Sequence, residues 1–289
     1  MKIAIASGKG GTGKTTLAVN LARYASEASE VLLADLDVEE PNSGIFIKGE
    51  LIHDRMITRM VPTWQENKCN LCGKCAVWCR FQAVLKLGAE IVIMPELCHS
   101  CYACSDLCPE GALPMEALPL GELKHYQSDN LHFVESRLNI GVEQAVPLIS
   151  KTIGYLRENF QSIDLEFWDC PPGTSCSVMT AVADADFVIL VTEPTPFGLY
   201  DLRLAVETME QLGKPVAVVI NRYGIGNDDV FEYCQEKEIP IWGIIPNQRS
   251  IAEMYAMGEL IYPHVSEFRS ELKKIIERIG SFKQAICVK

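Results

Sequence analysis

The chain has 289 residues, 48% of them hydrophobic, which is enough for a main domain with a buried core and a small second unit. Its formal net charge of −12 at pH 7 argues against a general nucleic-acid binder and against adhesion to an anionic membrane. We see no signal peptide, and no apolar run approaches the roughly 18 residues of a membrane-spanning helix. We therefore expect a soluble, cytoplasmic protein without stable membrane association.

Apolar periodicity predicts a βαβ unit at the start of the chain. Lys2–Ala6 is a short apolar run typical of a strand, Ser7–Thr16 is expected to be a loop, and Leu17–Ser26 has helical spacing. A second continuous apolar run, Val31–Ala34, leads to Asp35. Uninterrupted apolar strands favour a mostly parallel sheet covered by helices on both faces, which is an α/β fold.

From about Pro41 to Leu120 this pattern is replaced by cysteines, turns and prolines, and after Leu138 it resumes. We expect an α/β domain at residues 1–59 and 120–289, interrupted by a small inserted domain at residues 60–119. The later predicted helices are Gly141–Asn159, Ser177–Ala185, Leu199–Leu212, Asp229–Glu236 and Val265–Ile279. The later predicted strands are Leu165–Asp169, Phe187–Thr192, Val216–Asn221 and Ile241–Ile245.

The last predicted helix has an apolar stripe, and two interpretations of it are open. The stripe consists of Phe268, Leu272, Ile275, Ile276 and Ile279. A membrane-targeting amphipathic tail would show such a stripe. Core packing is the favoured interpretation, because any helix on the surface of a globular domain shows one.

A glycine-rich loop lies between the first strand and the first helix. Residues 8–15, Gly-Lys-Gly-Gly-Thr-Gly-Lys-Thr, fit G-x-x-x-x-G-K-[ST] in the strand–loop–helix context that this motif requires. Glycines let successive backbone N–H groups converge on phosphate oxygens, and the N-terminus of the helix adds its positive dipole end. Lys14 can reach the β- and γ-phosphates, and the Thr15 hydroxyl can ligate Mg²⁺. A plain glycine turn would not need this context.

The position of Lys9 narrows the choice among the families of P-loop proteins. Lys9, followed by Gly-Gly-Thr-Gly-Lys-Thr-Thr, resembles the deviant Walker A loop of the MinD/ParA/Mrp and nitrogenase iron-protein superfamily of P-loop NTPases. The resemblance implies Mg²⁺-dependent ATP hydrolysis in an ATP-sandwich homodimer. In that family the early lysine reaches the partner subunit's nucleotide, so Lys9 and Lys14 are expected to take part in catalysis.

Three aspartates are expected to complete the site. Asp35 and Asp37 end the second strand, where carboxylates meet bound phosphates at the carboxyl edge of the sheet. By resemblance Asp37 positions or activates the attacking water. Asp169, in Trp-Asp-Cys-Pro-Pro-Gly, looks like the Walker B and switch II segment and would hold Mg²⁺ through water. The backbone N–H of Gly173 is expected to approach the γ-phosphate.

The base is expected to lie beyond the later strands. Asn221 and Arg222 match the family's adenine-contacting position, and Pro246 with Asn247 is expected to border the base. The residues alone leave ATP and GTP open. The complete predicted nucleotide-binding set is Gly8, Lys9, Gly10, Gly11, Thr12, Gly13, Lys14, Thr15, Thr16, Gly173, Asn221, Arg222 and Pro246.

Eight of the twelve cysteines lie between Cys69 and Cys108. They form two C-x2-C-x2-C-x3-C runs, and each cysteine of the second run follows its counterpart by 29 residues. Such dense, regular spacing in a chain without export signals indicates metal binding rather than disulfides. Zinc sites use two separated pairs of ligands, so the triplets followed by a fourth cysteine argue against zinc. The two runs are an internal repeat.

The repeat resembles the bacterial two-cluster ferredoxin, in which the fourth cysteine of each run binds the other cluster. The resemblance implies two [4Fe–4S] clusters in a small α+β domain. Cluster I would use Cys69, Cys72, Cys75 and Cys108, and cluster II would use Cys98, Cys101, Cys104 and Cys79. Arg80 stands where these ferredoxins carry proline, and its positive charge would favour the reduced state of cluster II.

The remaining cysteines and the histidines carry weaker signals. Cys170 and Cys176 flank the switch II segment and are best interpreted as small buried residues. An alternative places Cys176 of two subunits at a shared further cluster. Cys234 and Cys287 stand alone, so the late C-x-x-C pair of Mrp proteins is missing. The five histidines show no ligand spacing and are expected to be structural or on the surface.

Together the two motif sets resemble MinD-superfamily P-loop ATPases with an inserted ferredoxin domain, over nearly the whole chain. The resemblance implies an ATP-hydrolysing iron–sulfur protein that couples nucleotide state to electron transfer through two [4Fe–4S] clusters. An iron–sulfur cluster assembly or carrier ATPase of Mrp type is an alternative, and so is a MinD-like positioning ATPase with structural clusters. The expected partners are a second copy of the chain and an unidentified redox or acceptor protein, and no nucleic acid.

Overall fold

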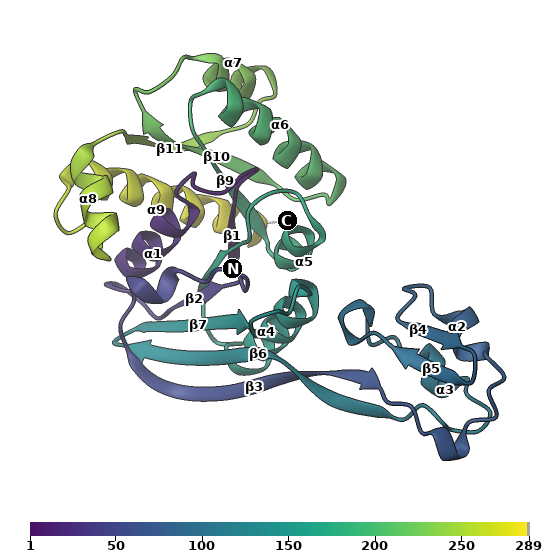
Figure 1. Cartoon of the computed structure of the whole chain (residues 1–289). Coiled ribbons are helices and arrows are strands. Elements are labelled where there is room, and N and C mark those ends of the chain that lie inside the picture. Colours follow the sequence, from purple (N-terminus) through teal and green to yellow (C-terminus); the bar gives the residue numbers. More distant parts are fainter. Residues whose placement is uncertain (288–289) are drawn as a thin grey trace. The chain divides into compact units, whose positions relative to one another are not determined.

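The computed structural model describes residues 1–287, and the chain forms two compact units (Figure 1). Unit 1 comprises Met1–Arg55, Leu123–Arg137 and Ile149–Lys289. Unit 2 comprises Met56–Glu122 and Leu138–Leu148. The chain therefore passes from unit 1 into unit 2 and back twice.

Within the described residues, nine strands form one sheet in the order β11-β10-β9-β1-β8-β2-β7-β6-β3. Pairing is parallel from β11 through to β7. The strands are β1 Lys2–Ala6, β2 Val31–Asp35, β3 Glu50–Pro62, β6 Met115–Ser128, β7 Leu131–Leu138, β8 Leu165–Asp169, β9 Phe187–Thr192, β10 Val216–Tyr223 and β11 Ile241–Pro246. Every residue of β2 and of β9 is buried, as a sheet with both faces covered requires.

Helices cover both faces of the parallel part of the sheet (Figure 1). Ile3 and Ile5 of β1 share one core with Leu17 of α1 and Phe268 of α9, whereas α5 and α6 pack on β1 and β9. The helices of unit 1 are α1 Lys14–Ala25, α5 Cys176–Val182, α6 Pro196–Gln211, α7 Asp229–Glu236, α8 Arg249–Met257 and α9 Ser266–Cys287. Helix α4, Ala145–Asn159, begins in unit 2 and ends in unit 1.

The apolar stripe of α9 packs in the core. Phe268, Leu272 and Ile275 are fully buried and Ile279 is nearly so, which confirms the core interpretation of this helix. Among the described helices, none combines the length and the apolar character needed to cross a bilayer.

The predicted strands and helices are present, but four elements of the sheet domain were not predicted. The missed elements are β3, β6, β7 and α8. The first half of β3 is exposed, and its apolar residues Leu51, Ile52 and Met56 neither alternate with polar ones nor form a continuous run that would mark a strand. Because β6 and β7 are joined by only two residues, Asp129 and Asn130, they form a hairpin at the end of the parallel sheet.

The 29-residue repeat of the sequence is also a repeat of the backbone in unit 2. A short 3₁₀ turn precedes each cysteine run, and a short helix, α2 Lys74–Trp78 or α3 Ala103–Asp106, follows inside it. Left-handed backbone conformations recur at the same offset, in the pairs Leu71 and Ser100, Gly73 and Tyr102, and Gln82 and Gly111. Between the two halves, β4 Val84–Leu87 and β5 Glu90–Ile93 pair antiparallel.

Candidate functional site

The loop between β1 and α1 depends on glycine for two different reasons. Gly11 and Gly13 have φ values of 76° and 95°, a left-handed conformation that residues with a side chain rarely adopt. At Gly8 the reason is space, because a Cβ atom there would lie 2.1 Å from the backbone oxygen of Asp201. The loop can therefore keep this path only with the glycines that the phosphate-loop motif contains.

This loop forms part of a cavity of about 1080 Å³, which includes space open to solvent. The predicted residues that line it are Gly10, Gly11, Gly13, Lys14, Thr15, Thr16, Asp37, Asn221, Arg222, Pro246 and Asn247. Asn221 is tied to the loop, since its Nδ2 donates a hydrogen bond to the backbone oxygen of Thr12 (2.7 Å). The structure thus brings the loop, the Asp37 segment and the ends of β10 and β11 to one cavity.

Helix α8 supplies a wall of the cavity that was not predicted. Ile251, Ala252 and Tyr255 line it together with Asn247 and Gln248. The side chains of Ile251, Ala252 and Tyr255 give the cavity an apolar wall, in contrast to the polar phosphate loop. The sequence signal was weak, because α8 is short and none of its residues is buried.

The ammonium group of Lys9 forms an ion pair with a carboxylate of the same chain. Its Nζ lies 3.3 Å from Oε2 of Glu193, and the other oxygen of Glu193 accepts a hydrogen bond from Nη1 of Arg222 at 2.6 Å. Glu193 is 7% exposed and follows directly after β9. Sequence reasoning missed this carboxylate, although it stands at the carboxyl end of a strand, as Asp35 and Asp169 do.

One of the predicted residues, Gly173, makes a backbone contact that occupies its N–H group. The N–H of Gly173 donates a hydrogen bond to the backbone oxygen of Ser7 at 2.9 Å, so in this conformation it is not free to reach a phosphate. Gly8, Lys9, Thr12, Asp169 and Gly173 do not line the cavity.

Asp35 and Asp169 are paired in register on the neighbouring strands β2 and β8. Asp35 is fully buried and accepts hydrogen bonds from the backbone N–H groups of Asp37 (3.0 Å), Asn42 (3.1 Å) and Ser43 (3.0 Å). Burial, and then the charge of Asp169, raise the pKa of Asp35. The Asp35 carboxyl group therefore shapes the loop that follows β2 rather than facing the cavity.

Asp169 and Asp37 both lie near Lys14, where the phosphate loop ends and α1 begins. The Ser43 hydroxyl donates a hydrogen bond to Oδ2 of Asp169 (3.3 Å), and burial raises the Asp169 pKa to about 6, against the opposing effects of the Thr15 side chain and the Lys14 charge. Asp37 lines the cavity, and burial raises its pKa to about 6 as well, against the opposing charge of Lys14. One hydroxyl, two carboxylates and one ammonium group are thus gathered at the start of α1.

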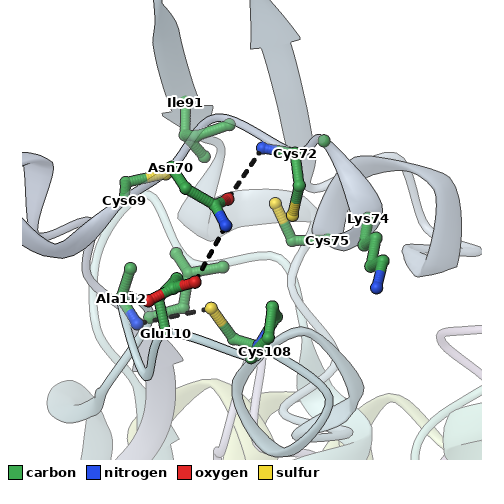
Figure 2. A pocket seen from close by; sticks show the side chains of 12 residues that line it. Cys69, Asn70, Cys72, Lys74, Cys75, Ile91, Cys108, Glu110 and Ala112 are labelled. Carbon is green, nitrogen blue, oxygen red and sulfur yellow. Dashed lines mark hydrogen bonds between the residues drawn. The ribbon is translucent and has the colours of Figure 1, made fainter.

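The cysteines of unit 2 surround two cavities of equal size. Each contains about 330 Å³ of space, part of it open to solvent. The first cavity is lined by Cys69, Cys72, Cys75 and Cys108, whose thiols point toward one another in Figure 2. The second cavity is lined by Cys98, Cys101, Cys104 and Cys79. Each cavity takes three thiols from one run and the fourth from the other, the grouping that the ferredoxin resemblance implies.

Backbone N–H groups point at the sulfur atoms in the same way in both halves. The four N–H···S hydrogen bonds are Leu71 to Cys69 (3.4 Å), Ser100 to Cys98 (3.5 Å), Ala83 to Cys79 (3.2 Å) and Ala112 to Cys108 (3.3 Å). Burial, and then the neighbouring thiols Cys98 and Cys101, raise the pKa of Cys104 to about 11. Four thiols this close do not ionise together without a positive charge between them.

Among the described residues, no three carboxylate, imidazole or thiol groups are arranged to hold a single metal ion. In a [4Fe–4S] cube the four thiolates bind four different irons, so they stand farther apart around a shared space.

Three of the five histidines converge in unit 1, although the sequence gave no sign of this. Nε2 of His132 lies 2.8 Å from Oε1 of Glu30, and Nδ1 of His132 lies 3.0 Å from Nε2 of His125. Nδ1 of His125 lies 3.3 Å from the Tyr155 hydroxyl, and His53 stacks on the Tyr155 ring. Because the carboxylate can only accept, neutral imidazoles donate along this chain from Tyr155 toward Glu30. These histidines form a connected network, and their expected structural role stays a prediction.

Of the two cysteines expected to be small and buried, only Cys170 is buried. Cys170 and Cys234 are buried and not bonded to other cysteines. The expectation was wrong for Cys176, which is exposed because it lies in the first turn of α5, a helix that buries Val178, Ala181 and Val182 instead. The alternative role of Cys176 between two subunits stays a prediction. The side chain of Cys287 lies outside the described residues.

Comparisons with known proteins agree with this site. A family model described as the CobQ/CobB/MinD/ParA nucleotide-binding domain matches residues 3–261. An uncharacterised protein of Methanocaldococcus jannaschii is 30% identical over 98% of this chain and 97% of its own length. An iron–sulfur cluster carrier protein of Pyrococcus horikoshii is 25% identical over 98% of this chain and 88% of its own length. The cell-division ATPase MinD of Pyrococcus furiosus has a similar fold, with a TM-score of 0.60 at 19% identity over 97% of this chain and 98% of its own. The chain therefore belongs to the CobQ/CobB/MinD/ParA nucleotide-binding family and is a P-loop ATPase of the MinD/ParA type.

Proposed function

We propose that this ATPase carries two [4Fe–4S] clusters in an inserted ferredoxin-like domain at residues 60–119, and that its nucleotide state governs electron transfer through them. The observation that carries the proposal is the pair of equal cavities in unit 2, each lined by three thiols of one run and one of the other. A duplicated set of crossed thiols suits two cubes of four irons.

Buried polar atoms without partners support both cofactors. Among the described residues, four buried side-chain atoms lack a hydrogen-bond partner, namely Thr12 Oγ1, Asp169 Oδ1, Arg59 Nε and Trp64 Nε1. Leaving such an atom unpaired costs about 1–3 kcal/mol, so native proteins rarely do so without a reason. The first two belong to the nucleotide site, where phosphate and hydrated Mg²⁺ would pair with them. The last two are N–H donors in unit 2, where an anionic cluster would accept their hydrogen bonds.

Each half of unit 2 would hold its cluster by the same means. A bound [4Fe–4S] cluster accepts and releases one electron at a potential set by its surroundings. The chain supplies four thiolates per cavity and N–H···S hydrogen bonds that stabilise negative charge on sulfur. Cys72 and Cys101 are exposed, one at each cavity, so an electron-transfer partner could approach either cluster.

The nucleotide site would act through residues that the structure brings together. Lys14 would bind the β- and γ-phosphates of ATP, Thr15 and Asp169 would hold Mg²⁺, and Asp37 would position the attacking water. For Lys9 to reach the nucleotide of a second copy, its ion pair with Glu193 must open. The active form would then be a homodimer.

The path of the chain supports a link between the two activities. Strand β3 leaves unit 1 soon after the Asp37 segment, and β6 returns to unit 1 before Asp169. Segments that sense a γ-phosphate change position or order on hydrolysis. The insertion therefore joins the chain between the two segments that respond to nucleotide.

Metal content tests the clusters directly. Protein purified without oxygen should contain about eight irons per chain, four in each of two clusters. Cys75→Ser and Cys104→Ser, one from each cavity, should each lose about half of this iron. Cys234→Ser is the matched control, since Cys234 is also buried but lies in unit 1, and it should keep all of the iron. Colourless wild-type protein would refute the proposal.

Coupling is tested by measuring both reduction potentials and the rate of electron transfer to an acceptor, with and without a non-hydrolysable ATP analogue. At least one of these quantities should change when the analogue binds. Values that stay the same in a protein that demonstrably binds the analogue would show that the nucleotide does not govern electron transfer.

A second function has support in the relatives that are named iron–sulfur cluster carrier proteins, such as that of P. horikoshii. A carrier must release its cluster, whereas complete ligation by four thiolates predicts a firmly held one. Incubation of the loaded protein with an apo-acceptor separates the two. Transfer of iron would favour the carrier, and retained iron with electron transfer would favour our proposal. A positioning ATPase with structural clusters would hydrolyse ATP and localise independently of cluster redox state.

A further inference from the structure

Arg59 is a buried cation in unit 2 without an anionic partner. It lies on β3, its exposed fraction is 6%, and it forms no ion pair with any described residue. Nη1 donates hydrogen bonds to the backbone oxygen of Cys98 (2.8 Å) and to Oε1 of Gln144 (2.6 Å), which are neutral acceptors. Nε has no partner. The charge of this side chain is therefore uncompensated by the protein.

A guanidinium in a protein carries its positive charge permanently, so Arg59 needs compensation from its surroundings. Burial of an unpaired charge is strongly unfavourable, so the surroundings are expected to provide an anion. Cys98, whose backbone oxygen Arg59 contacts, lines the second cysteine cavity with Cys101 and Cys104. The nearest source of negative charge is therefore the set of thiolates and the cluster that would occupy that cavity.

We infer that Arg59 is the counter-charge of the cluster held by Cys98, Cys101, Cys104 and Cys79, and that it raises the reduction potential of this cluster above that of the other. The inference rests on the proposed function, because it needs the two clusters. A cube bound by four thiolates is anionic and gains one more negative charge on reduction. A fixed positive charge in a buried environment therefore favours the reduced form.

Among the described residues, the first cavity has no comparable cation. Of its lining residues only Lys74 is basic, and Lys74 is exposed, so water and salt screen its charge. Lys86 is exposed as well and donates to the backbone oxygen of Leu71. The orphan donor in this half, Trp64 Nε1, is neutral. The two halves share their backbone and thiols but differ in buried charge.

The contacts of Gln144 fix Arg59 in place. Its Oε1 accepts from Arg59, while its Nε2 donates to the backbone oxygen of Glu96 at 2.8 Å. The Ser100 hydroxyl donates to the backbone oxygen of Met60, the next residue of β3, at 2.6 Å. Gln144 is thus a positioning residue that holds the guanidinium against the start of the second cysteine run.

A redox titration followed by electron paramagnetic resonance tests the inference on the whole protein, with dithionite as the reductant. In Arg59→Gln and Arg59→Met the equilibrium constant for reduction of the cluster in the second cavity should fall at least tenfold, which lowers its reduction potential by at least 59 mV for one electron. The reduction potential of the other cluster should not change. Arg59→Lys keeps the charge and should keep the potential. Arg80→Gln is the matched control, because Arg80 is exposed beside Cys79 of the same cavity, and it should shift the potential less.

A second readout does not depend on the cluster potential. In protein depleted of iron, Arg59→Met should raise the melting temperature, because it removes a buried charge that nothing compensates; in loaded protein it should not. Wild-type protein without iron would contradict the proposed function. A wild type with about eight irons, but with potentials that Arg59→Gln leaves unchanged or shifts equally, would contradict this inference alone.

Discussion

Asp37 and Asp169 both have a pKa of about 6, and in each case burial is the main cause. For a group that must be ionised to orient or activate water, this value lies close to the working pH. Lys14 favours the ionised form of both carboxyl groups, and the Thr15 hydroxyl does so for Asp169. The site is thus arranged so that a small fall in pH removes charge from both carboxylates.

We expect kcat/KM for ATP to decrease as pH falls through about 6, because Asp37 then becomes protonated. Above about pH 7 the group is ionised and the profile should be flat. Asp37→Asn should lower kcat by about 10²- to 10⁴-fold, the usual contribution of a group that acts on the attacking nucleophile. Steady-state kinetics between about pH 5 and 8 measure both effects.

Equilibrium binding of nucleotide separates catalysis from folding in this experiment. Asp37→Asn should bind ATP with an affinity close to that of the wild type, since Lys14 and the loop are unchanged. Asp54→Asn, an exposed aspartate on β3, is the control and should leave kcat as it was. Wild-type turnover by Asp37→Asn would rule out the assigned role.

At the level of residues, the sequence predicted what a motif encodes and missed what only packing creates. The loop glycines, Lys14 and the eight cysteines could be found because their spacing is dictated by phosphate and thiolate chemistry. Glu193 and Arg59 could not, since their roles depend on partners far away in the sequence, such as Lys9 and Cys98. A burial state cannot be derived from the residue type alone.

Strands β6 and β7 and helix α4 together enclose the histidine network of unit 1. His125 lies on β6, His132 on β7 and Tyr155 on α4. Burial lowers the pKa of His125 to about 4, and the neighbouring imidazoles of His132 and His53 add to this effect. The surroundings of His125 therefore favour a neutral imidazole, and the network ends at the exposed carboxylate of Glu30.

This environment predicts acid sensitivity of the elements that carry it. The pKa of a histidine is about 6.5 in the unfolded chain, whereas that of His125 in the folded chain is about 4. Between these two pH values the unfolded state therefore binds a proton that the folded state does not bind. The free energy of unfolding should therefore fall by up to about 3 kcal/mol between these two pH values. Urea unfolding at about pH 7 and about pH 5 measures the loss.

His125→Asn should flatten this pH dependence, although it also lowers stability at pH 7 by removing hydrogen bonds. His264→Asn replaces an exposed histidine and should retain the full slope. An equal slope in the wild type and in His125→Asn would mean that other groups cause the acid sensitivity.

Among the elements, those with a clear apolar period were predicted and those without one were not. β2 and β9 are buried along their whole length and give continuous apolar runs. β3 begins exposed and becomes buried only near Ile57, and its apolar residues come in adjacent pairs rather than at alternate positions, so no strand period marks it. Helix α8 has no buried residue and is recognisable only by its place beside the nucleotide cavity.

The whole molecule consists of two units whose cores differ in kind. The core of unit 1 is a large apolar cluster built on Ile3, Leu33, Phe167 and Phe268. The apolar clusters of unit 2 are small and include Cys75, Cys98 and Cys104 themselves. A core of this size is marginal without a metal centre.

We therefore expect calorimetry of the loaded protein to show two unfolding transitions, and removal of iron to lower the melting temperature of only the one that belongs to unit 2. Nucleotide binding should survive iron removal, because its residues lie in unit 1. A control with Cys234→Ser should show the same lowering of one transition on iron removal. A single transition that moves as a whole would contradict the expected independence.

The exchange of the fourth cysteine between the two halves has a consequence for the origin of unit 2. A peptide containing one half alone would have three thiols around its cavity and a fourth turned toward a neighbour, so it could complete its set only by pairing with a second copy of itself. The present arrangement is what two such identical peptides would become after tandem duplication joined them in one chain. Later divergence could then give each half its own electrical surroundings without altering the scaffold they share.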